Sequence, residues 1–387
     1  MGPVLTTVIF LAAIGLGLPD SLLGAGWPVI RTELSVPLSA AGIITMIICG
    51  GTIVSSLLAD RLIRRAGTGI VTAVSIAVTA LALFGFCVAD SFLLFCLLAI
   101  PFGLGAGAVD AALNNHVALY GTSRQMSWYH AFWGVGAVIS PNVMGFCLGR
   151  GMGFRAGYLT VAAALVLICA AVFLSLPLWK KGTQAQTEVK ARLLTIPQAL
   201  RIPGVPYIML AFFGFCALES SAGLWASSYL VTHRGISADT AATFASLFYI
   251  GETAGRFLNG FVADRFGDRK MIRIGILVMV FGVALLGLPL RSDIPALTGL
   301  LIIGVGAAPV YPCIVHATPD NFGKENSQSL VGMQMASAYC GSTFMPPVFG
   351  LIAQHLNIGL YPVFLAVFAV LMLVMTEKLN RTVASGR

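Results

Sequence analysis

The stretch FVADRFGDRK, residues 261–270, matches an earlier stretch of the chain, LLADRLIRRAG at residues 57–67. Each of the two follows a long apolar run and places several charges within a few residues. Two further pairs of stretches occur in the same order: GLGAGAVDAALNNH (103–116) with GVGAAPVYPCIVH (304–316), and SPNVMG (140–145) with MPPVFG (345–350). The sequence therefore predicts two related halves.

The composition of the chain indicates an integral membrane protein. Of its 387 residues, 58% are hydrophobic and only 10% are charged, whereas a soluble domain carries about 25% charged residues. The apolar run from Val4 to Ile30 is too long for the core of a signal peptide, so we expect it to be the first membrane span. The 8 cysteines are scattered singly, which predicts neither disulfides nor zinc. We expect no metal and no cofactor.

Charge breaks and Pro/Gly positions divide the chain into twelve predicted spans, because a bilayer-spanning helix needs about 20 apolar residues. The spans lie near residues 4–30, 38–60, 69–89, 91–119, 127–149, 155–179, 205–231, 239–263, 271–290, 295–318, 327–354 and 358–376. The predicted fold is an all-α membrane protein with twelve transmembrane helices in two pseudo-symmetric bundles. An N-terminal six-helix bundle covers residues 1–179, a cytoplasmic linker residues 180–204, and a C-terminal six-helix bundle residues 205–387.

The distribution of basic residues predicts the orientation, because cytoplasmic loops are enriched in Lys and Arg. If both termini are cytoplasmic, most of the 23 Lys and Arg residues fall in the inner loops and the tail. The net charge of +8 then follows from topology and needs no nucleic-acid partner. We expect a multi-pass protein of the plasma or inner membrane.

Two six-span repeats are typical of secondary transporters, which bind their substrate between the repeats near the middle of the bilayer. The chain has no G-x-x-x-x-G-K-[ST] loop, which argues against an ATP-driven pump. We therefore expect a transporter and not an enzyme.

The two charged loops resemble the signature loop of the major facilitator superfamily, G-x-L-a-D-r-x-G-r-k. The second copy fits this pattern better than the first, in which Ser55 or Ser56 stands near the expected glycine and Ile63 replaces the later one. In that family the loop makes charge contacts that latch one closed state. The resemblance therefore implies a gating role for four residues: Asp60, Arg61, Asp264 and Arg265.

Several stretches also resemble the fucose permease and glucose/mannose:proton symporter branch of that superfamily. They are LPDSLL (18–23), DAALN (110–114), ALESSAGLWASSYL (217–230), GETAGRFLNG (251–260), GAAPVYPCIVHATPDNFG (306–323) and GMQMASAYCGSTFMPPVFGLI (332–352). Asp20 and Asp110 fall where the fucose permease has a span 1 aspartate and a span 4 glutamate, which implies proton coupling. Asn114 matches an asparagine there. Trp133 stands where the permease uses an asparagine for its sugar, so fucose itself is not the expected substrate.

Polar residues within the spans are functional candidates, because a charged side chain at the bilayer centre costs about 2.5–3.5 kcal/mol on insertion scales. Asp20 is interpreted as a proton carrier or a ligand for sugar hydroxyls, and Asp110 with Asn114 one turn later as a proton relay or a sugar site. For each acid the alternative is a structural hydrogen bond between helices. Glu252 and Arg256 are spaced i, i+4, so they can pair on one helix face. They form either a structural pair or a gating switch.

The predicted substrate site also includes residues from both halves. Glu219 corresponds in the second half to Asp20 and precedes Trp225 by six residues, so an acid and an indole could hold a sugar together. Trp133, at the position described above, joins this site. His130 could relay protons or bind a loop. The remaining members either line the cavity or join helices: Gln334, Tyr311 and Asn142.

The sequence thus favours a proton-coupled symporter of a neutral hexose-like sugar. The alternative is a proton-coupled exporter of drugs or metabolites; a membrane receptor without transport activity is a third class, disfavoured by the buried acids and the paired loops. The expected partners are a sugar-like small molecule, protons and the lipid bilayer, and we expect a monomer.

Overall fold

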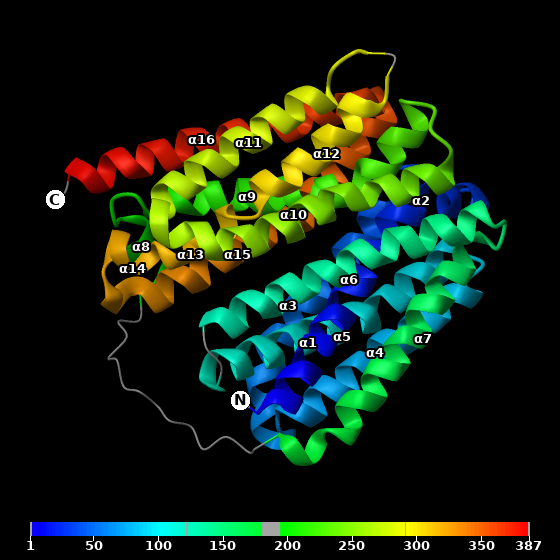
Figure 1. Cartoon of the computed structure of the whole chain (residues 1–387), viewed down its shortest axis with the longest axis horizontal. Coiled ribbons are helices and arrows are strands. Elements are labelled where there is room, and N and C mark those ends of the chain that lie inside the picture. The colour runs from blue at the N-terminus through cyan, green and yellow to red at the C-terminus, as the bar shows by residue number, and fades with distance from the viewer. Residues whose placement is uncertain (1, 121–122, 180–193, 291, 386–387) are drawn as a thin grey trace. The chain divides into compact units, whose positions relative to one another are not determined.

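The structure is a computed structural model that describes residues 2–120, 123–179, 194–290 and 292–385. Every regular element in these ranges is a helix (Figure 1). The prediction of an all-α membrane protein is confirmed.

Twelve long helical segments follow one another in the described part of the chain. Six lie in the first half: α1 (Pro3–Asp20) continued by α2 (Leu22–Glu33), α3 (Ala40–Ala66), α4 (Thr68–Val88), α5 (Phe92–Tyr120), α6 (Ser123–Gly149) and α7 (Gly153–Leu174). Six lie in the second: α9 (Val205–Thr232), α10 (Ala238–Phe266), α11 (Asp268–Leu286), α12 (Ile294–Ala307) continued by α13 (Val310–His316), α15 (Lys324–Ile352) and α16 (Tyr361–Ser385). The short helices α8 (Ile196–Leu200) and α14 (Thr318–Phe322) connect them.

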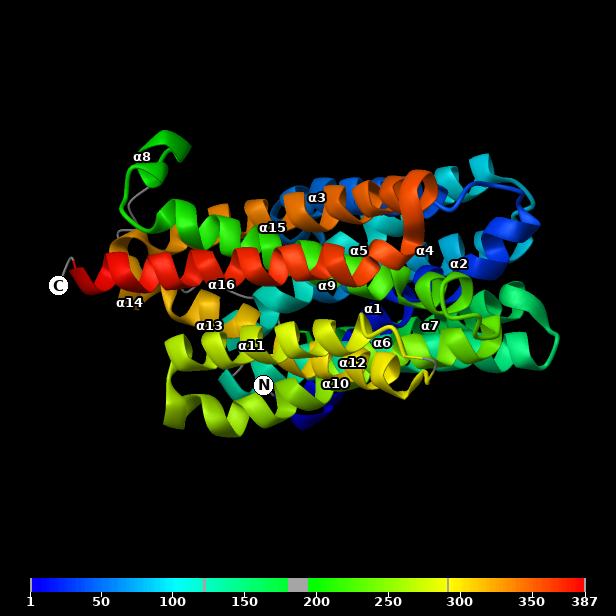
Figure 2. The same cartoon turned by 90° about the horizontal axis from the view of Figure 1, so that it is seen from above.

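Nine segments of the described residues are long and apolar enough to cross a membrane, and one of them, Ser329–Val383, covers most of both α15 and α16. The two remaining long helices, α10 and α11, carry more charge. Glu252 and Arg256 lie within α10, and α11 begins with charged residues. Figures 1 and 2 both show α11 lying along α12. Twelve spans therefore agree with the helices, although two of them are less apolar than the others.

Two of the predicted spans are broken helices. The first is divided between α1 and α2 by Ser21, immediately after Asp20, and the tenth between α12 and α13 by Ala308 and Pro309. Pro19 and Pro309 have no backbone N–H, so each removes a helical hydrogen bond at its break. A break exposes backbone polar groups, which membrane proteins tolerate where the helix lines a cavity or packs on protein.

The chain forms two compact units that do not coincide with its two halves. The first unit contains Met1–Gly182, Gly223–Ile250 and Pro347–Gly359, and the second contains Thr183–Ala222, Gly251–Pro346 and Leu360–Arg387. One end of each of α9, α10 and α15 therefore packs with the helices of the first half. The division at 1–179, 180–204 and 205–387 describes the internal repeat and stays a prediction.

Candidate functional site

Asp20 is the last residue of α1, and close packing against α6 fixes its position. An added Cβ on Gly17 would clash with the backbone carbonyl of Trp133, so only glycine permits this approach of the two helices. Two serine hydroxyls join the helices beside the break. Ser21 donates to the Ala137 carbonyl at 2.8 Å, and Ser140 donates to the carbonyl of Leu18. The Ser140 bond satisfies a carbonyl beside the break, and the Ser21 bond satisfies the Ala137 carbonyl of α6, whose usual helical donor would be the N–H that Pro141 lacks.

The carboxylate of Asp20 accepts a hydrogen bond from an indole. Trp133 Nε1 donates to Asp20 Oδ2 at 2.8 Å, and the Asp20 side chain is exposed although it belongs to an apolar helix. Trp133 is half-buried. The structure thus brings together a residue predicted to couple protons and a residue predicted to bind substrate. It uses the indole as a hydrogen-bond donor to the acid, which orients the carboxylate.

Asp110 is the centre of a second cluster. Asn114 Nδ2 donates to Asp110 Oδ1 at 2.8 Å, and the Tyr129 hydroxyl donates to the same oxygen at 3.2 Å. Asp110 and Asn114 are half-buried on α5, whereas Tyr129 is buried on α6. All of these donors are neutral, so the acid is hydrogen-bonded but not compensated by a cation through them.

Tyr129 is the functional candidate that sequence reasoning missed. It stands between Trp128 and His130, and it precedes Trp133 by four residues. Residues spaced i, i+4 lie on one helix face. One face of α6 therefore supplies one donor to each acid. This spacing was the signal that could have identified Tyr129.

Two other predicted residues of the first unit, His130 and Asn142, also lie on α6. The ring of His130 lies 5.1 Å from that of Tyr129, measured between centroids. Asn142 Nδ2 donates to the Val138 carbonyl of its own helix at 2.8 Å. Their roles as substrate ligands stay predictions.

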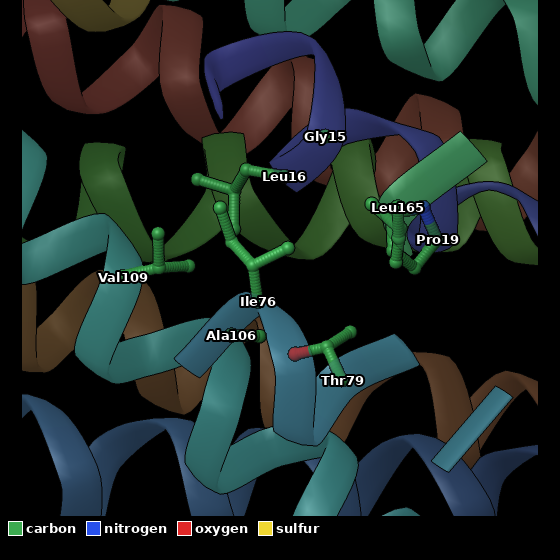
Figure 3. Close-up of a pocket in the computed structure, with 8 residues that line it drawn as sticks. All are labelled: Gly15, Leu16, Pro19, Ile76, Thr79, Ala106, Val109 and Leu165. Carbon is green, nitrogen blue, oxygen red and sulfur yellow. The ribbon is translucent and has the colours of Figure 1, made fainter. Parts of the chain in front are cut away.

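A small pocket is lined by the residues that precede the two acids in the sequence, Pro19 and Val109, but neither Asp20 nor Asp110 lines it (Figure 3). It is lined by Gly15, Leu16, Pro19, Ile76, Thr79, Ala106, Val109 and Leu165. In the figure, Leu16, Ile76 and Val109 point toward one another across it. The Thr79 hydroxyl donates to the Ser75 carbonyl at 3.1 Å. The lining therefore offers a sugar almost no polar contact.

The second unit holds a triad of charges on α9 and α10. Arg256 NH2 lies 2.6 Å from Glu252 Oε1 and 3.3 Å from Glu219 Oε1. The structure thus shows the expected i, i+4 pair, and it adds Glu219 to that pair. Glu252 is 1% exposed, Arg256 15% and Glu219 21%. Breaking such a buried network is costly, because the remaining charge loses its partner.

Glu219 and Trp225 both lie on α9 but belong to different compact units, and their joint role in a sugar site stays a prediction. The Trp225 side chain is 0% exposed, and its ring centroid lies 5.9 Å from that of Phe349. In this structure the indole has no surface left for a substrate. Its burial favours packing over direct sugar contact.

Gln334 and Tyr311 also make contacts within the second unit. Gln334 is buried, and its Nε2 donates to the Thr318 hydroxyl oxygen at 3.1 Å. The Tyr311 hydroxyl donates to Met335 Sδ at 3.3 Å, and the centroid of its ring lies 4.9 Å from that of Phe212, with the two ring planes tilted by 41°. Gln334 therefore joins two helices, which was the alternative that the sequence left open.

Within the first unit, helices from both halves of the chain meet at three places. An added Cβ on Gly24 of α2 would lie 2.7 Å from the Gly223 carbonyl oxygen of α9, and one on Gly42 of α3 would lie 2.6 Å from Pro347 Cα of α15. The third contact joins α6 and α10, where a Cβ on Gly145 would lie 2.7 Å from the Asp239 carbonyl oxygen. Small residues allow this close approach of helix backbones.

Hydrogen bonds reinforce these contacts between the halves. Ser227 of α9 donates to the Ala25 carbonyl at 3.1 Å, and the Ser39 hydroxyl donates to Gln354 Oε1 at 2.5 Å. All of these residues lie toward the helix ends that the distribution of basic residues predicts to be outside the cell. We call these glycine-mediated contacts between the halves the inter-half seal.

The repeated charged loops lie at the other ends of the helices. Arg61 and Arg265 are exposed at the ends of α3 and α10. The side chains of Asp60 and Asp264 lie outside the residues that the structure describes. The gating role of all four stays a prediction.

We expect Trp133→Phe to weaken proton-driven glucose uptake while the fold is kept. The change removes the N–H donor to Asp20 and keeps an aromatic ring. A hydrogen bond to a charged group contributes about 1.5–3 kcal/mol when buried. Because Asp20 is exposed, we expect about 1 kcal/mol, or about a fivefold loss of uptake.

The matched control is Trp128→Phe, since Trp128 is an exposed tryptophan on the same helix. Uptake of radiolabelled glucose into proteoliposomes measures both variants. An equal loss in the two would show that the Asp20 bond carries no special function.

Comparison with known proteins supports the fold and the class. Residues 9–245 and 208–379 match the Major Facilitator Superfamily. An uncharacterized MFS-type transporter of Yersinia pestis is 22% identical over 264 residues, which are 66% of this chain and 64% of that protein. A probable nitrate transporter of Staphylococcus haemolyticus is 26% identical over 248 residues, 64% of this chain and 62% of that protein. The matches thus span a little under two thirds of these relatives.

A solved structure matches the chain over nearly its whole length. A variant of the nucleoside transporter NupG is 12% identical, covers 98% of both chains and has a TM-score of 0.78. This likeness concerns the fold.

Proposed function

The chain belongs to the Major Facilitator Superfamily, whose members carry molecules across membranes by alternating access, and from that premise we propose that it is a proton-coupled symporter of a neutral, hexose-like sugar. We further propose that Asp20 and Asp110 carry the proton coupling. As in the sequence-based prediction, the protein is placed in the plasma or inner membrane as a monomer with cytoplasmic termini.

The observation that carries this proposal is the environment of the two acids. The donors to Asp20 and Asp110 are an indole, a phenol and a carboxamide, all of them neutral. A carboxyl group within the membrane that lacks a cationic partner is less costly in its protonated form. Such a group can take up a proton on one side of the membrane and release it on the other. It can also accept hydrogen bonds from sugar hydroxyls.

The two acids and the pairing of Arg256 argue against an anionic substrate. The relative from Staphylococcus haemolyticus is named as a probable nitrate transporter, and an anion is held by arginine or lysine side chains. Arg256, which lies deep within α10, is already shared by two carboxylates. An anion at Asp20 or Asp110 would meet like charge whenever these acids are ionised. A neutral polyol would meet hydrogen-bonding partners there.

Asp20→Asn should abolish proton-driven sugar accumulation. The amide cannot carry a proton, although it has nearly the same shape and keeps an oxygen for Trp133. Purified protein in liposomes with an inward proton gradient is assayed for uptake of radiolabelled glucose. We expect the wild type to accumulate glucose, a protonophore to collapse the accumulation, and the variant to lose at least about 90% of it, since one carboxyl cannot replace the other in a coupled cycle.

The matched control is Asp90→Asn, because Asp90 is exposed between α4 and α5. Its uptake should equal that of the wild type. Accumulation that persists in Asp20→Asn would remove Asp20 from the coupling mechanism.

Proton-coupled export of drugs or metabolites is the second candidate function. An exposed carboxylate beside an aromatic ring, as in Asp20 and Trp133, also suits a cationic compound. The absence of glucose uptake by well-folded protein, together with efflux of a lipophilic cation against its gradient, would favour this alternative.

A further inference from the structure

A second pocket lies within the second unit, and no residue of the charge triad lines it. Three of its polar lining residues come from three different helices: Arg269 from α11, Asn321 from α14 and Asn380 from α16. The helices α11 and α16 pack against each other in this unit (Figure 1). The pocket lies at the start of α11 and near the end of α16. It is therefore at the helix ends that the distribution of basic residues predicts to face the cytoplasm.

Arg269 and the two asparagines offer this pocket hydrogen-bond donors. Arg269 Nη2 donates to Asn321 Oδ1 at 3.1 Å. A carboxamide oxygen is neutral, so this contact orients the guanidinium and leaves its positive charge in place. The contact involves the oxygen of Asn321 and not its amide N–H groups, and the Asn380 carboxamide brings a further amide to the lining. Such a set suits a negatively charged group that only accepts hydrogen bonds.

The acids that lie beside this pocket in the sequence have partners of their own. Asp268 precedes Arg269, and its Oδ2 lies 2.7 Å from His316 Nδ1. Glu377 of α16 accepts two hydrogen bonds from Arg273, at 2.5 and 2.6 Å. Neither carboxylate lines the pocket. An anion beside Arg269 therefore does not need to displace either of these contacts.

Much of the remaining lining is apolar. Four buried aliphatic side chains contribute to it: Ile208, Ile272, Ile314 and Leu379. The Thr376 hydroxyl also lines the pocket, but it donates to the Met372 carbonyl at 2.8 Å, so the backbone already uses that donor. The lining thus combines one cation and two amides with hydrocarbon, which matches an amphipathic ligand.

The size of the pocket limits what enters it. The pocket and its open mouth contain about 310 Å³ of space, most of it at the mouth. A small charged group can bind there, whereas long carbon chains have to stay outside, along the helices. Basic pockets between helices on the cytoplasmic side of membrane proteins bind the headgroups of anionic lipids.

We propose that this pocket binds the phosphate group of an anionic phospholipid. The Arg269 guanidinium pairs with the phosphate oxygens, which it can contact through two parallel hydrogen bonds. The amides of Asn321 and Asn380 donate to the same group, and the carbon chains lie against apolar helix surface in the bilayer. The bound lipid connects α11, α14 and α16 at their ends. This proposal does not depend on which substrate the protein carries.

Native mass spectrometry of the purified full-length protein in detergent tests the site. Phosphatidylglycerol is added in steps, and the dissociation constant of the first bound lipid is measured. Arg269→Gln should weaken this binding about tenfold, or about 1.4 kcal/mol, because glutamine removes the charge that pairs with the phosphate. Asn380→Leu should weaken it about fivefold, because it removes a neutral hydrogen bond. The second variant tests the site even if the first fails to fold.

The matched control is Lys270→Gln. Lys270 is an exposed neighbour of Arg269 on the same helix and does not line the pocket. Its replacement removes the same charge from the surface and should change the dissociation constant less than about twofold, whereas general attraction of an anionic lipid to basic residues would weaken both variants equally. An equal loss in Lys270→Gln and Arg269→Gln overturns the proposal, and so does wild-type affinity in Arg269→Gln and Asn380→Leu.

Inorganic phosphate distinguishes a lipid headgroup from a free phosphate ion, because it offers the same oxygens without carbon chains. We expect inorganic phosphate to displace phosphatidylglycerol only at concentrations far above that of the lipid. Displacement at equal concentrations would overturn the lipid as the ligand and assign the site to the free ion. Loss of glucose uptake in a protein that still binds the lipid would concern only the proposed symport.

Discussion

Gly24→Val should abolish transport by preventing the inter-half seal from closing. An added Cβ at this position would lie 2.7 Å from the Gly223 carbonyl oxygen and 3.0 Å from Leu224 Cα. Both are backbone atoms, which cannot turn aside as a flexible side chain does. Overpacking of this kind costs about 1–3 kcal/mol, which lowers the population of the sealed state about 5- to 150-fold. Because alternating access requires this state, transport falls with its population.

Thiol labelling measures the seal without any substrate. In the wild-type background a cysteine introduced by Ser227→Cys should be protected, because Ser227 is 0% exposed and bonds to Ala25 across the contact. Gly24→Val should make this cysteine reactive to a membrane-impermeant maleimide, as quantified by mass spectrometry of its peptide.

The matched control for the seal is Gly50→Val on α3, where an added Cβ meets nothing within 4 Å. It should change neither labelling nor glucose uptake. Equal labelling in Gly24→Val and Gly50→Val would contradict the role of Gly24, and so would full transport by Gly24→Val.

Arg256→Ala should destabilise the protein strongly as well as stop transport. The change leaves Glu219 and Glu252 facing each other without their shared cation. Removing one partner of a buried ion pair costs about 3–5 kcal/mol. The partial exposure of Glu219 favours the lower end, about 3 kcal/mol, since solvent screens that acid. Chemical denaturation of the purified protein measures the effect as a shift of the unfolding midpoint.

A second substitution should rescue much of this loss. Glu252→Gln in the Arg256→Ala background removes the most buried of the unpaired charges, so the double variant should be more stable than Arg256→Ala alone. Arg273→Ala is the matched control. Arg273 also pairs with a glutamate, Glu377, through contacts of 2.5 and 2.6 Å, but its side chain is 51% exposed. Its loss should change stability little, because water screens exposed pairs. A stable, fully active Arg256→Ala variant would contradict both the structural and the switching role.

Several features of the site were predictable because they depend on spacing along one helix. Asp110 with Asn114, and Glu252 with Arg256, are spaced i, i+4, and each pair is in contact in the structure. Family resemblance marked Asp20 and Trp133 as separate candidates for proton coupling and substrate binding, and the structure shows a hydrogen bond between them. Tyr129 was missed because its partner, Asp110, lies on another helix, and only its i, i+4 spacing from Trp133 on α6 could have identified it.

By itself the sequence determined that this is a membrane protein built of long helices in two related halves. Apolar length, charge breaks and the repeated loops are local properties, and a bilayer requires every backbone polar group to be satisfied within its own helix. The tertiary structure decided what depends on contacts between helices. It showed the attachment of one end of α9 to the first half of the chain, the sharing of Arg256 between Glu219 and Glu252, and the burial of Trp225 against Phe349. These features depend on which helices cross, and the crossings need small residues such as Gly17, Gly24 and Gly42 where two backbones approach closely. The periodicity within a single helix does not specify which other helix packs against those residues.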